Sequence, residues 1–280
     1  MNIGIVGLGL IGGSIAKAIK ENTKHKVFGA DLIESVKKKA VLLEAIDGEL
    51  TKENLCLCDM VIVALYPSDT VAYIKAHGGF FGKGALVVDC CGVKEYVVGE
   101  IQPVAEKHGF LFVGGHPMAG IEYSGFAYAQ KALFQNAYMI LTPPPGIEIH
   151  RLGEIKAFWL KLGFKDVVIS TPQTHDRLIA FTSQLAHVVS SAYVKSPAAL
   201  EHKGYSAGSF KDLTRVARLN PDMWSELFLL NRENLTREID QVIENLCDYR
   251  EAIRGGDGEQ LHRLLREGTK KKAEADLLLS

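Results

Sequence analysis

The sequence predicts a doubly wound α/β sheet followed by an all-α C-terminal domain. Two observations support this prediction. Up to about residue 170, short β-rich runs alternate with helical stretches, which is typical of parallel strands joined by crossover helices. Beyond residue 171 the strand pattern stops and one helical pattern follows another. We therefore predict a first domain at residues 1–170 and a second, helical domain at residues 171–280.

The strands of the first domain are predicted from seven apolar runs. Most of these runs are continuous rather than alternating, as expected for strands that are covered on both faces of a sheet. They are Ile3–Val6, Val27–Ala30, Met60–Leu65, Ala85–Val88, Leu111–Val113, Tyr138–Leu141 and Val167–Ile169. Helices are expected around Gly13–Lys20 and Glu34–Leu43, and an amphipathic helix is expected near Arg151–Lys161, after a proline-rich loop.

The helical domain is expected to begin near His175 and to be interrupted at Lys195–Ser209 and at the glycine-rich residues 255–258. Its roughly 110 residues form too small and elongated a unit to hold a deep core alone. In two-domain architectures of this kind the helical part often packs against a second copy of itself. We therefore expect a homodimer.

Composition excludes several classes of protein. Hydrophobic residues make up 47% of the 280 residues, charged residues make up 23%, and the net charge is −1. A folded protein without a basic excess is not expected to bind nucleic acid or an anionic membrane. The sequence contains no apolar run of membrane-spanning length and no signal peptide. Its five cysteines lack the spacing of a zinc site. We expect a cytoplasmic protein without a structural metal.

The first apolar run leads into a glycine motif that opens a helix. Its residues are Gly7, Leu8, Gly9, Leu10, Ile11 and Gly12. Gly7 permits a tight turn, Gly9 lets the backbone approach a pyrophosphate, and Gly12 lets the helix pack closely on the sheet. Free amides at the helix N-terminus favour the negative phosphates. This motif predicts a dinucleotide-binding, Rossmann-type domain.

Asp31 is expected to choose between the two nicotinamide dinucleotides. It stands at the end of the second predicted strand, 19 residues after Gly12. A carboxylate there can accept hydrogen bonds from the ribose hydroxyls and would repel a 2′-phosphate. The neighbouring Lys37, Lys38 and Lys39 could soften this discrimination. We expect NAD to be preferred over NADP.

Two segments with unusual chemistry follow predicted strands, where dinucleotide sheets bind their ligands. In the first, His116 follows two glycines, a setting that disfavours a core position. Its near-neutral pKa suits it to take a proton from a hydroxyl while hydride leaves the same carbon. A turn histidine that satisfies local backbone is the alternative. The second segment is the polar turn Asp89–Lys94.

The helical half contributes two pairs at helical spacing. Ser183 and His187 are four residues apart and are expected to share one helix face. Lys211 and Arg215 have the same spacing and would make a cationic face for a carboxylate, to which arginine can bind in bidentate geometry. Each pair alone is more often an ordinary surface pair than a site.

Together these motifs resemble the prephenate dehydrogenase family, which includes arogenate dehydrogenases. The resemblance rests on the glycine motif, H-P-M-A-G at 116–120, S-Q-L-x-H at 183–187 and K-D-x-T-R-x-A-x-x-x-P-x-x-W at 211–224, and it runs from residue 1 to at least 240. It implies a dimer-forming helical domain and NAD-dependent oxidative decarboxylation of prephenate to 4-hydroxyphenylpyruvate. Arogenate is the alternative substrate and would give tyrosine directly. Inhibition by tyrosine stays open, and without an ACT domain it would be competition at the active site. We expect neither a chorismate mutase segment nor an ACT domain.

The resemblance also implies roles for single residues. His116 matches the catalytic histidine that hydrogen-bonds the ring hydroxyl of the substrate, and Arg215 matches the arginine that binds a substrate carboxylate. Further implied pocket residues are His187, Glu122, Trp224 and Lys211. Gly92 departs from the pattern, since many members have a serine there whose hydroxyl touches the substrate hydroxyl. Either water or another donor fills the gap, or activity is lower.

Two other protein classes share part of this pattern. Dehydrogenases of the 3-hydroxyisobutyrate or pyrroline-carboxylate reductase type also join a dinucleotide domain to a helical dimer domain, but they lack the H-P-M-A-G segment. A non-catalytic NAD-sensing protein is the alternative from a different class, and Gly92 leaves it some room. The absence of a basic DNA-binding face counts against a redox-sensing repressor.

Overall fold

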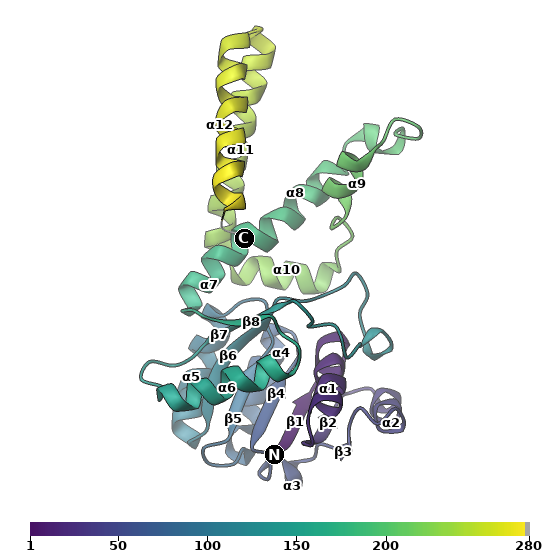
Figure 1. The fold of residues 1–280 in the computed structure, drawn as a ribbon, viewed down its shortest axis with the longest axis vertical. Coiled ribbons are helices and arrows are strands. Elements are labelled where there is room, and N and C mark those ends of the chain that lie inside the picture. Colours follow the sequence, from purple (N-terminus) through teal and green to yellow (C-terminus); the bar gives the residue numbers. More distant parts are fainter. Residues whose placement is uncertain (278–280) are drawn as a thin grey trace. The chain divides into compact units, whose positions relative to one another are not determined.

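Eight strands form one sheet in the computed structural model, which describes residues 1–277 (Figure 1). Their order is β3-β2-β1-β4-β5-β6-β7-β8, and neighbouring strands are parallel except β6 and β7. The strands are β1 (Asn2–Val6), β2 (Lys26–Ala30), β3 (Gly48–Glu49), β4 (Met60–Val63), β5 (Leu86–Asp89), β6 (Leu111–Pro117), β7 (Tyr138–Thr142) and β8 (Asp166–Ile169). All seven predicted strands are confirmed. The two-residue β3 was not predicted, because so short a strand leaves no pattern in the sequence.

Helices cover both faces of this sheet, which confirms the doubly wound prediction. Alternate residues of a strand point to opposite faces, and β4 shows the division. Ile62 belongs to the buried cluster that includes α1 and α6, whereas Val61 and Val63 belong to the cluster that includes α4 and α5. The helices are α1 (Leu10–Asn22), α2 (Glu34–Leu42), α3 (Lys52–Leu55), α4 (Pro67–His77), α5 (Glu95–His108) and α6 (Ile149–Lys161).

The prediction that the strand before His116 ends at Val113 is wrong. β6 continues to Pro117, because Gly114–Pro117 pair antiparallel with β7. Glycine is needed at both positions before the histidine. A Cβ on Gly114 would lie 2.3 Å from the Thr142 hydroxyl, and a Cβ on Gly115 would lie 2.5 Å from the carbonyl oxygen of Asp89. His116 is therefore held in a paired strand rather than in a turn.

Helices follow the last strand, as predicted. They are α7 (Pro172–Ile179), the π-helix η3 (Ala180–Leu185), α8 (Ala186–Tyr193), α9 (Gly208–Thr214) and α10 (Pro221–Leu230), with a short 3₁₀ turn, η4 (Pro197–Leu200), before α9. The first helix begins at Pro172, where the Thr171 hydroxyl accepts a hydrogen bond from the Thr174 amide and caps it. The break between α9 and α10 and the π-helix were not predicted.

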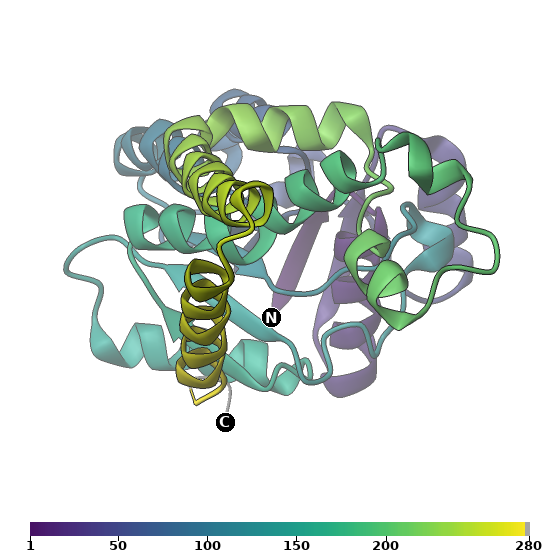
Figure 2. The same ribbon diagram turned by 90° about the horizontal axis from the view of Figure 1, so that it is seen from above.

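The chain divides into two compact units, Met1–Asn231 and a second unit that begins at Arg232. The second unit consists of α11 (Arg232–Gly255) and α12 (Gly258–Asp276), shown from above in Figure 2. The Tyr249 hydroxyl donates to the carbonyl of Leu264, and Asp257 caps α12 at the predicted glycine-rich break. The predicted domain boundary at 170/171 stays a prediction. Among residues 1–277, no helix is both long and apolar enough to cross a membrane.

Candidate active site

The glycine motif forms a turn between β1 and α1 with space on its outer side. Gly7 has φ +85°, and a Cβ on Gly12 would lie 1.9 Å from the Gly7 carbonyl oxygen, so neither position accepts a side chain. Gly9, the N-cap of α1, has no atom within 4 Å of the position that a Cβ would occupy. The backbone is therefore open to a ligand at Gly9 and closed by protein at Gly7 and Gly12.

The apolar residues of the motif differ in burial, and Asp31 is hydrogen-bonded to the motif's backbone. The side chain of Leu8 is buried in the core, whereas Leu10 and Ile11 are half-buried. Asp31 accepts hydrogen bonds from the amides of Leu8 (2.8 Å) and Ile33 (2.9 Å). This carboxylate is thus fixed beside the glycine turn at the end of β2, where a ribose would lie. The open backbone at Gly9 and the fixed acceptor at Asp31 fit a dinucleotide.

His116 lies at the centre of a second cluster, near the end of β6. Its Nδ1 lies 2.9 Å from Nε2 of His175, and Nδ1 of His175 lies 2.6 Å from Oδ1 of Asp176. His116 is half-buried, whereas His175 and Asp176 are only 2% and 1% exposed. A row of one carboxylate and two imidazoles therefore leads from the interior to a histidine that reaches the surface.

A buried ion pair fixes the backbone before His116. Lys94 and Asp89 are both fully buried and bound to each other. Lys94 Nζ also donates to the carbonyl of Gly115 at 2.7 Å, and Asp89 Oδ1 accepts from the amide of Gly115 at 3.0 Å. Both backbone polar groups of Gly115 are thus bound by charged side chains. Charge-assisted bonds of this kind are stronger than neutral ones, so the position of the His116 backbone is well defined.

The surroundings of His116 favour its neutral form. Burial lowers the pKa of His116 well below its usual value, and the nearby His175 and Lys94 lower it further. Burial also lowers the pKa of His175, although Asp176 opposes this shift. A histidine that is neutral at pH 7 can act as a proton acceptor, which is the state a general base needs.

Gly92 leaves space beside this histidine. A Cβ built there would lie 3.4 Å from Leu227 Cδ2 and 3.9 Å from His116 Cε1, which are ordinary contacts. The neighbouring Cys91 does not supply the missing hydroxyl, because its buried thiol has the Thr70 hydroxyl (3.3 Å) and the Leu65 carbonyl (3.6 Å) as its hydrogen-bonding partners. The space at Gly92 therefore faces His116.

The predicted site residues of the helical half include His187 and Trp224, which contact each other. His187 packs against Trp224 with ring centroids 3.9 Å apart and the ring planes tilted by 30°, and its Nδ1 lies 2.8 Å from the Ser183 carbonyl. Burial lowers the pKa of His187, and the nearby Arg215 lowers it further. Leu227, which faces Gly92, lies one turn of α10 after Trp224. α10 therefore links the His187 group to the His116 cluster.

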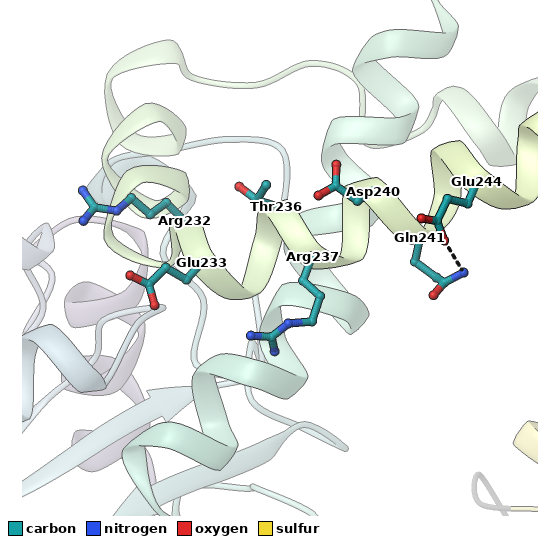
Figure 3. A pocket seen from close by; sticks show the side chains of 7 residues that line it. All are labelled: Arg232, Glu233, Thr236, Arg237, Asp240, Gln241 and Glu244. Carbon is teal, nitrogen blue, oxygen red and sulfur yellow. Dashed lines mark hydrogen bonds between the residues drawn. The ribbon is translucent and has the colours of Figure 1, made fainter.

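Arg215 lines an open depression of about 490 Å³. The lining residues are Glu122, Thr214, Arg215, Ala217 and Arg218. The structure thus brings together Glu122 and Arg215, and it adds Arg218, which the sequence analysis did not single out. Lys211 is exposed on α9 and does not line this depression. A second depression, of about 590 Å³, is lined by seven polar residues of α11 alone and contains none of the predicted site residues (Figure 3).

His175 and Asp176 are the main residues that sequence reasoning missed. They lie in the middle of α7, where a polar pair is common in any helix, and the link from His175 to His116 spans 59 positions of sequence. No local spacing signals such a contact. Lys94 and Asp89 were noted only as part of a polar turn, and their complete burial was not foreseen.

Comparison with sequence families gives two matches that together cover most of the chain. "Prephenate dehydrogenase, nucleotide-binding domain" matches residues 15–168. "Prephenate dehydrogenase, dimerization domain" matches residues 171–267.

Two curated relatives are similar over most of the chain. The prephenate dehydrogenase of Bacillus subtilis (strain 168) is 32% identical over 269 residues, which cover 92% of this chain and 72% of that protein. The cyclohexadienyl dehydrogenase of Zymomonas mobilis (strain ZM4) is 29% identical and covers 97% of this chain and 94% of its own length.

Solved structures of prephenate and arogenate dehydrogenases are similar to this chain over nearly its whole length. Prephenate dehydrogenase from A. aeolicus, in complex with hydroxyphenyl propionate and NAD+, superposes with a TM-score of 0.86 at 31% identity, covering 98% of both chains. Synechocystis arogenate dehydrogenase gives a TM-score of 0.83 at 25% identity, covering 98% of this chain and 100% of its own. A 3-hydroxyisobutyrate dehydrogenase from Salmonella typhimurium covers 94% of this chain and 99% of its own, with a TM-score of 0.57 at 14% identity. That last likeness is one of fold alone.

Proposed function

The chain belongs to the prephenate dehydrogenase family, and we propose that it converts prephenate to 4-hydroxyphenylpyruvate by NAD-dependent oxidative decarboxylation. The observation that carries this proposal is the position of His116, which is fixed near the end of β6 beside an open position at Gly92 and whose pKa is lowered by burial. The same sheet carries the glycine turn and Asp31, which fit the cofactor.

In this reaction His116 takes the proton of the ring hydroxyl while hydride leaves the carbon that carries it. Bound NAD+ supplies the hydride acceptor. The ring carboxylate leaves as CO₂, its bonding electrons complete the aromatic ring, and the former hydroxyl oxygen regains a proton as a phenol. The protein has to orient the substrate, hold its negative charge and move one proton.

We assign the substrate's charge to the helical side of the site. Arg215 lines the depression that Glu122 and Arg218 also line. Two positively charged side chains and one negatively charged side chain thus border it. This excess of positive charge suits prephenate, which carries two carboxylates and no ammonium group. Arogenate, whose side chain has an ammonium group, would gain less from the second arginine. The tilted pair of His187 and Trp224 would form an aromatic wall for the substrate ring.

Parallel assays with two substrates and two cofactors test the function. Reduction of the nicotinamide is followed at 340 nm with prephenate or arogenate, and with NAD+ or NADP+. We expect the highest kcat/KM with prephenate and NAD+, because of Arg218 and Asp31. Activity with neither substrate would contradict the proposal and favour a non-catalytic NAD-binding protein.

The His116→Asn variant tests the assigned base. Its kcat is expected to fall by about 10²–10⁴-fold, the usual contribution of general acid–base catalysis. The affinity for NAD+ should be nearly unchanged, because the glycine turn is untouched.

Addition of tyrosine to the wild-type assay tests whether tyrosine competes with the substrate. Competition would raise the KM for the substrate and leave kcat unchanged.

A further inference from the structure

We propose that His175 and Asp176 are positioning residues that hold His116 in the tautomer whose Nε2 is free to take the substrate proton. This inference rests on the proposed function and names two residues that serve it without touching the substrate. It follows from the order of donors and acceptors along the row from Asp176 to His116.

The row begins with a group that accepts hydrogen bonds at both of its oxygens. Asp176 Oδ1 accepts from the amide of Lys94 at 2.7 Å, and Oδ2 accepts from the amide of Glu95 at 2.9 Å. An ionised carboxylate has no proton to donate. Nδ1 of His175, 2.6 Å from Oδ1, must therefore carry a proton and donate it.

The remaining nitrogen of His175 then sets the state of His116. In neutral His175, a proton on Nδ1 leaves Nε2 as an acceptor. Since this Nε2 lies 2.9 Å from Nδ1 of His116, the His116 nitrogen is the donor. The proton of neutral His116 is thus fixed on Nδ1, and its lone pair is on Nε2. A histidine without this partner would divide its proton between the two nitrogens.

The fold makes this arrangement rigid. Asp176 lies on α7, but its carboxylate binds the first amides of α5, so it joins two helices. Asn231 donates to the Asp176 carbonyl at 2.8 Å and holds α7 from a third direction. Lys94 joins both parts of the site, because its amide binds Asp176 and its ammonium binds the Gly115 carbonyl. The ring and the backbone of His116 are thus positioned from the same helix start.

The charges around His116 suit the proton transfer. The groups that face it are His175 from α7 and Lys94 from the start of α5, with Asp89 bound to Lys94 and Asp176 bound to His175. When His116 becomes positive, its Nδ1–H continues to donate to His175, and the negative Asp176 lies behind that ring. The row therefore needs no rearrangement during the step, as preorganised electrostatic stabilisation requires.

A purely structural role is the competing explanation. Asp176 could simply cap α5, and His175 could simply fill the core. Two substitutions separate the explanations, because they keep different halves of the histidine. In His175→Asn, the amide can replace Nδ1 and donate to Asp176 but cannot reach His116. In His175→Gln, the amide oxygen can take the place of Nε2 and accept from His116.

The first readout is the ¹⁵N spectrum of histidine-labelled protein without substrate, with the His116 signals assigned by their loss in His116→Asn. In the wild type and in His175→Gln we expect a protonated Nδ1 and an unprotonated Nε2. In His175→Asn we expect averaging between the two tautomers. A wild-type His116 protonated on Nε2 would overturn the inference, even if the enzyme is fully active.

The second readout is kinetic, with NAD+ affinity and thermal unfolding measured alongside. For His175→Asn we expect kcat to fall by about 10- to 100-fold, part of what a general base supplies, with KM changed less than about threefold. His175→Gln should keep kcat within about fivefold of the wild type. Equal losses in the two folded variants would overturn the inference. Wild-type inactivity would instead contradict the proposed function, and the spectrum would still test the tautomer.

Discussion

At the scale of single residues, the proposed chemistry requires a His116 that is uncharged and still accessible to the substrate. The protein achieves this with a half-buried ring whose neighbours are a histidine and a lysine. Two buried carboxylates, Asp89 and Asp176, bind these neighbours rather than His116 itself. A carboxylate in direct contact would raise the pKa of His116, whereas this arrangement leaves burial as the largest influence.

The first prediction concerns the pH dependence of kcat/KM. Because the pKa of His116 is lowered below its usual 6.5, the base stays neutral at and above that pH and gains a proton only in more acidic solution. Activity should therefore be present above pH 6.5 and be lost as the pH falls through the lowered pKa. Initial rates from pH 5 to 8 measure this, since kcat/KM reports the free enzyme. An acid limb centred at or above pH 7 would contradict it.

The second prediction concerns Gly92. A Cβ fits there at ordinary contact distances and points toward His116, and Gly92 is not among the glycines with positive φ. Gly92→Ser should fold normally and raise kcat by a few-fold, up to about tenfold, because one added hydrogen bond contributes about 1 kcal/mol. Gly92→Ala is the matched control, with the same Cβ and no hydroxyl. If both variants change kcat equally, the space is filled by packing rather than by a missing donor.

At the scale of elements, the glycine turn shows how one motif serves two purposes. Gly7 and Gly12 are required by the protein itself, since a Cβ at either would meet backbone oxygen. Gly9 has no such neighbour. The fold therefore does not require glycine at this position, and we attribute it to the expected approach of the dinucleotide.

The third prediction separates these purposes. Gly9→Ala should leave the thermal unfolding midpoint within about 2 °C of the wild type and weaken NAD+ binding by at least about tenfold, roughly 1.4 kcal/mol. Gly12→Ala should instead lower the unfolding midpoint, because its Cβ would lie 1.9 Å from the Gly7 carbonyl oxygen. Calorimetry gives both quantities. Unchanged NAD+ affinity in Gly9→Ala would show that the pyrophosphate does not pass there.

Elements also show what could be predicted from sequence. The longer strands and the glycine turn were predictable, because buried strands and phosphate turns leave local patterns. The extension of β6 to Pro117 was not, because it depends on pairing with β7, whose start lies more than 20 residues later. The contact between His116 and His175 was not predictable for the same reason. The chemistry of His116 could be read locally, whereas the residues that position it could not.

At the scale of the whole molecule, the second unit points to self-association. α11 exposes Ile243, Leu246 and Ile253, which are 52%, 61% and 64% exposed. At 100° per residue these three lie within one third of the helix circumference. Of the polar residues in Figure 3, Gln241 lies about 160° from Ile243 around the same helix and therefore on another side. An exposed apolar stripe of this kind is typical of an interface, and the region matches a dimerization domain.

The fourth prediction is that two copies of the chain associate through this stripe. Light scattering should give twice the 30.7 kDa chain mass for the wild type. Leu246→Glu should give the single-chain mass at micromolar concentration. Leu246 occurs twice in a two-fold dimer, once from each chain, and each copy contributes about 1.5–3 kcal/mol when buried. The loss of both copies therefore weakens association by roughly 10²–10⁴-fold. Gln241→Glu, which adds the same charge on the polar side, should leave the dimer intact. A single-chain mass for the wild type would contradict the dimer. The same mass for Leu246→Glu and Gln241→Glu would show that the interface lies elsewhere.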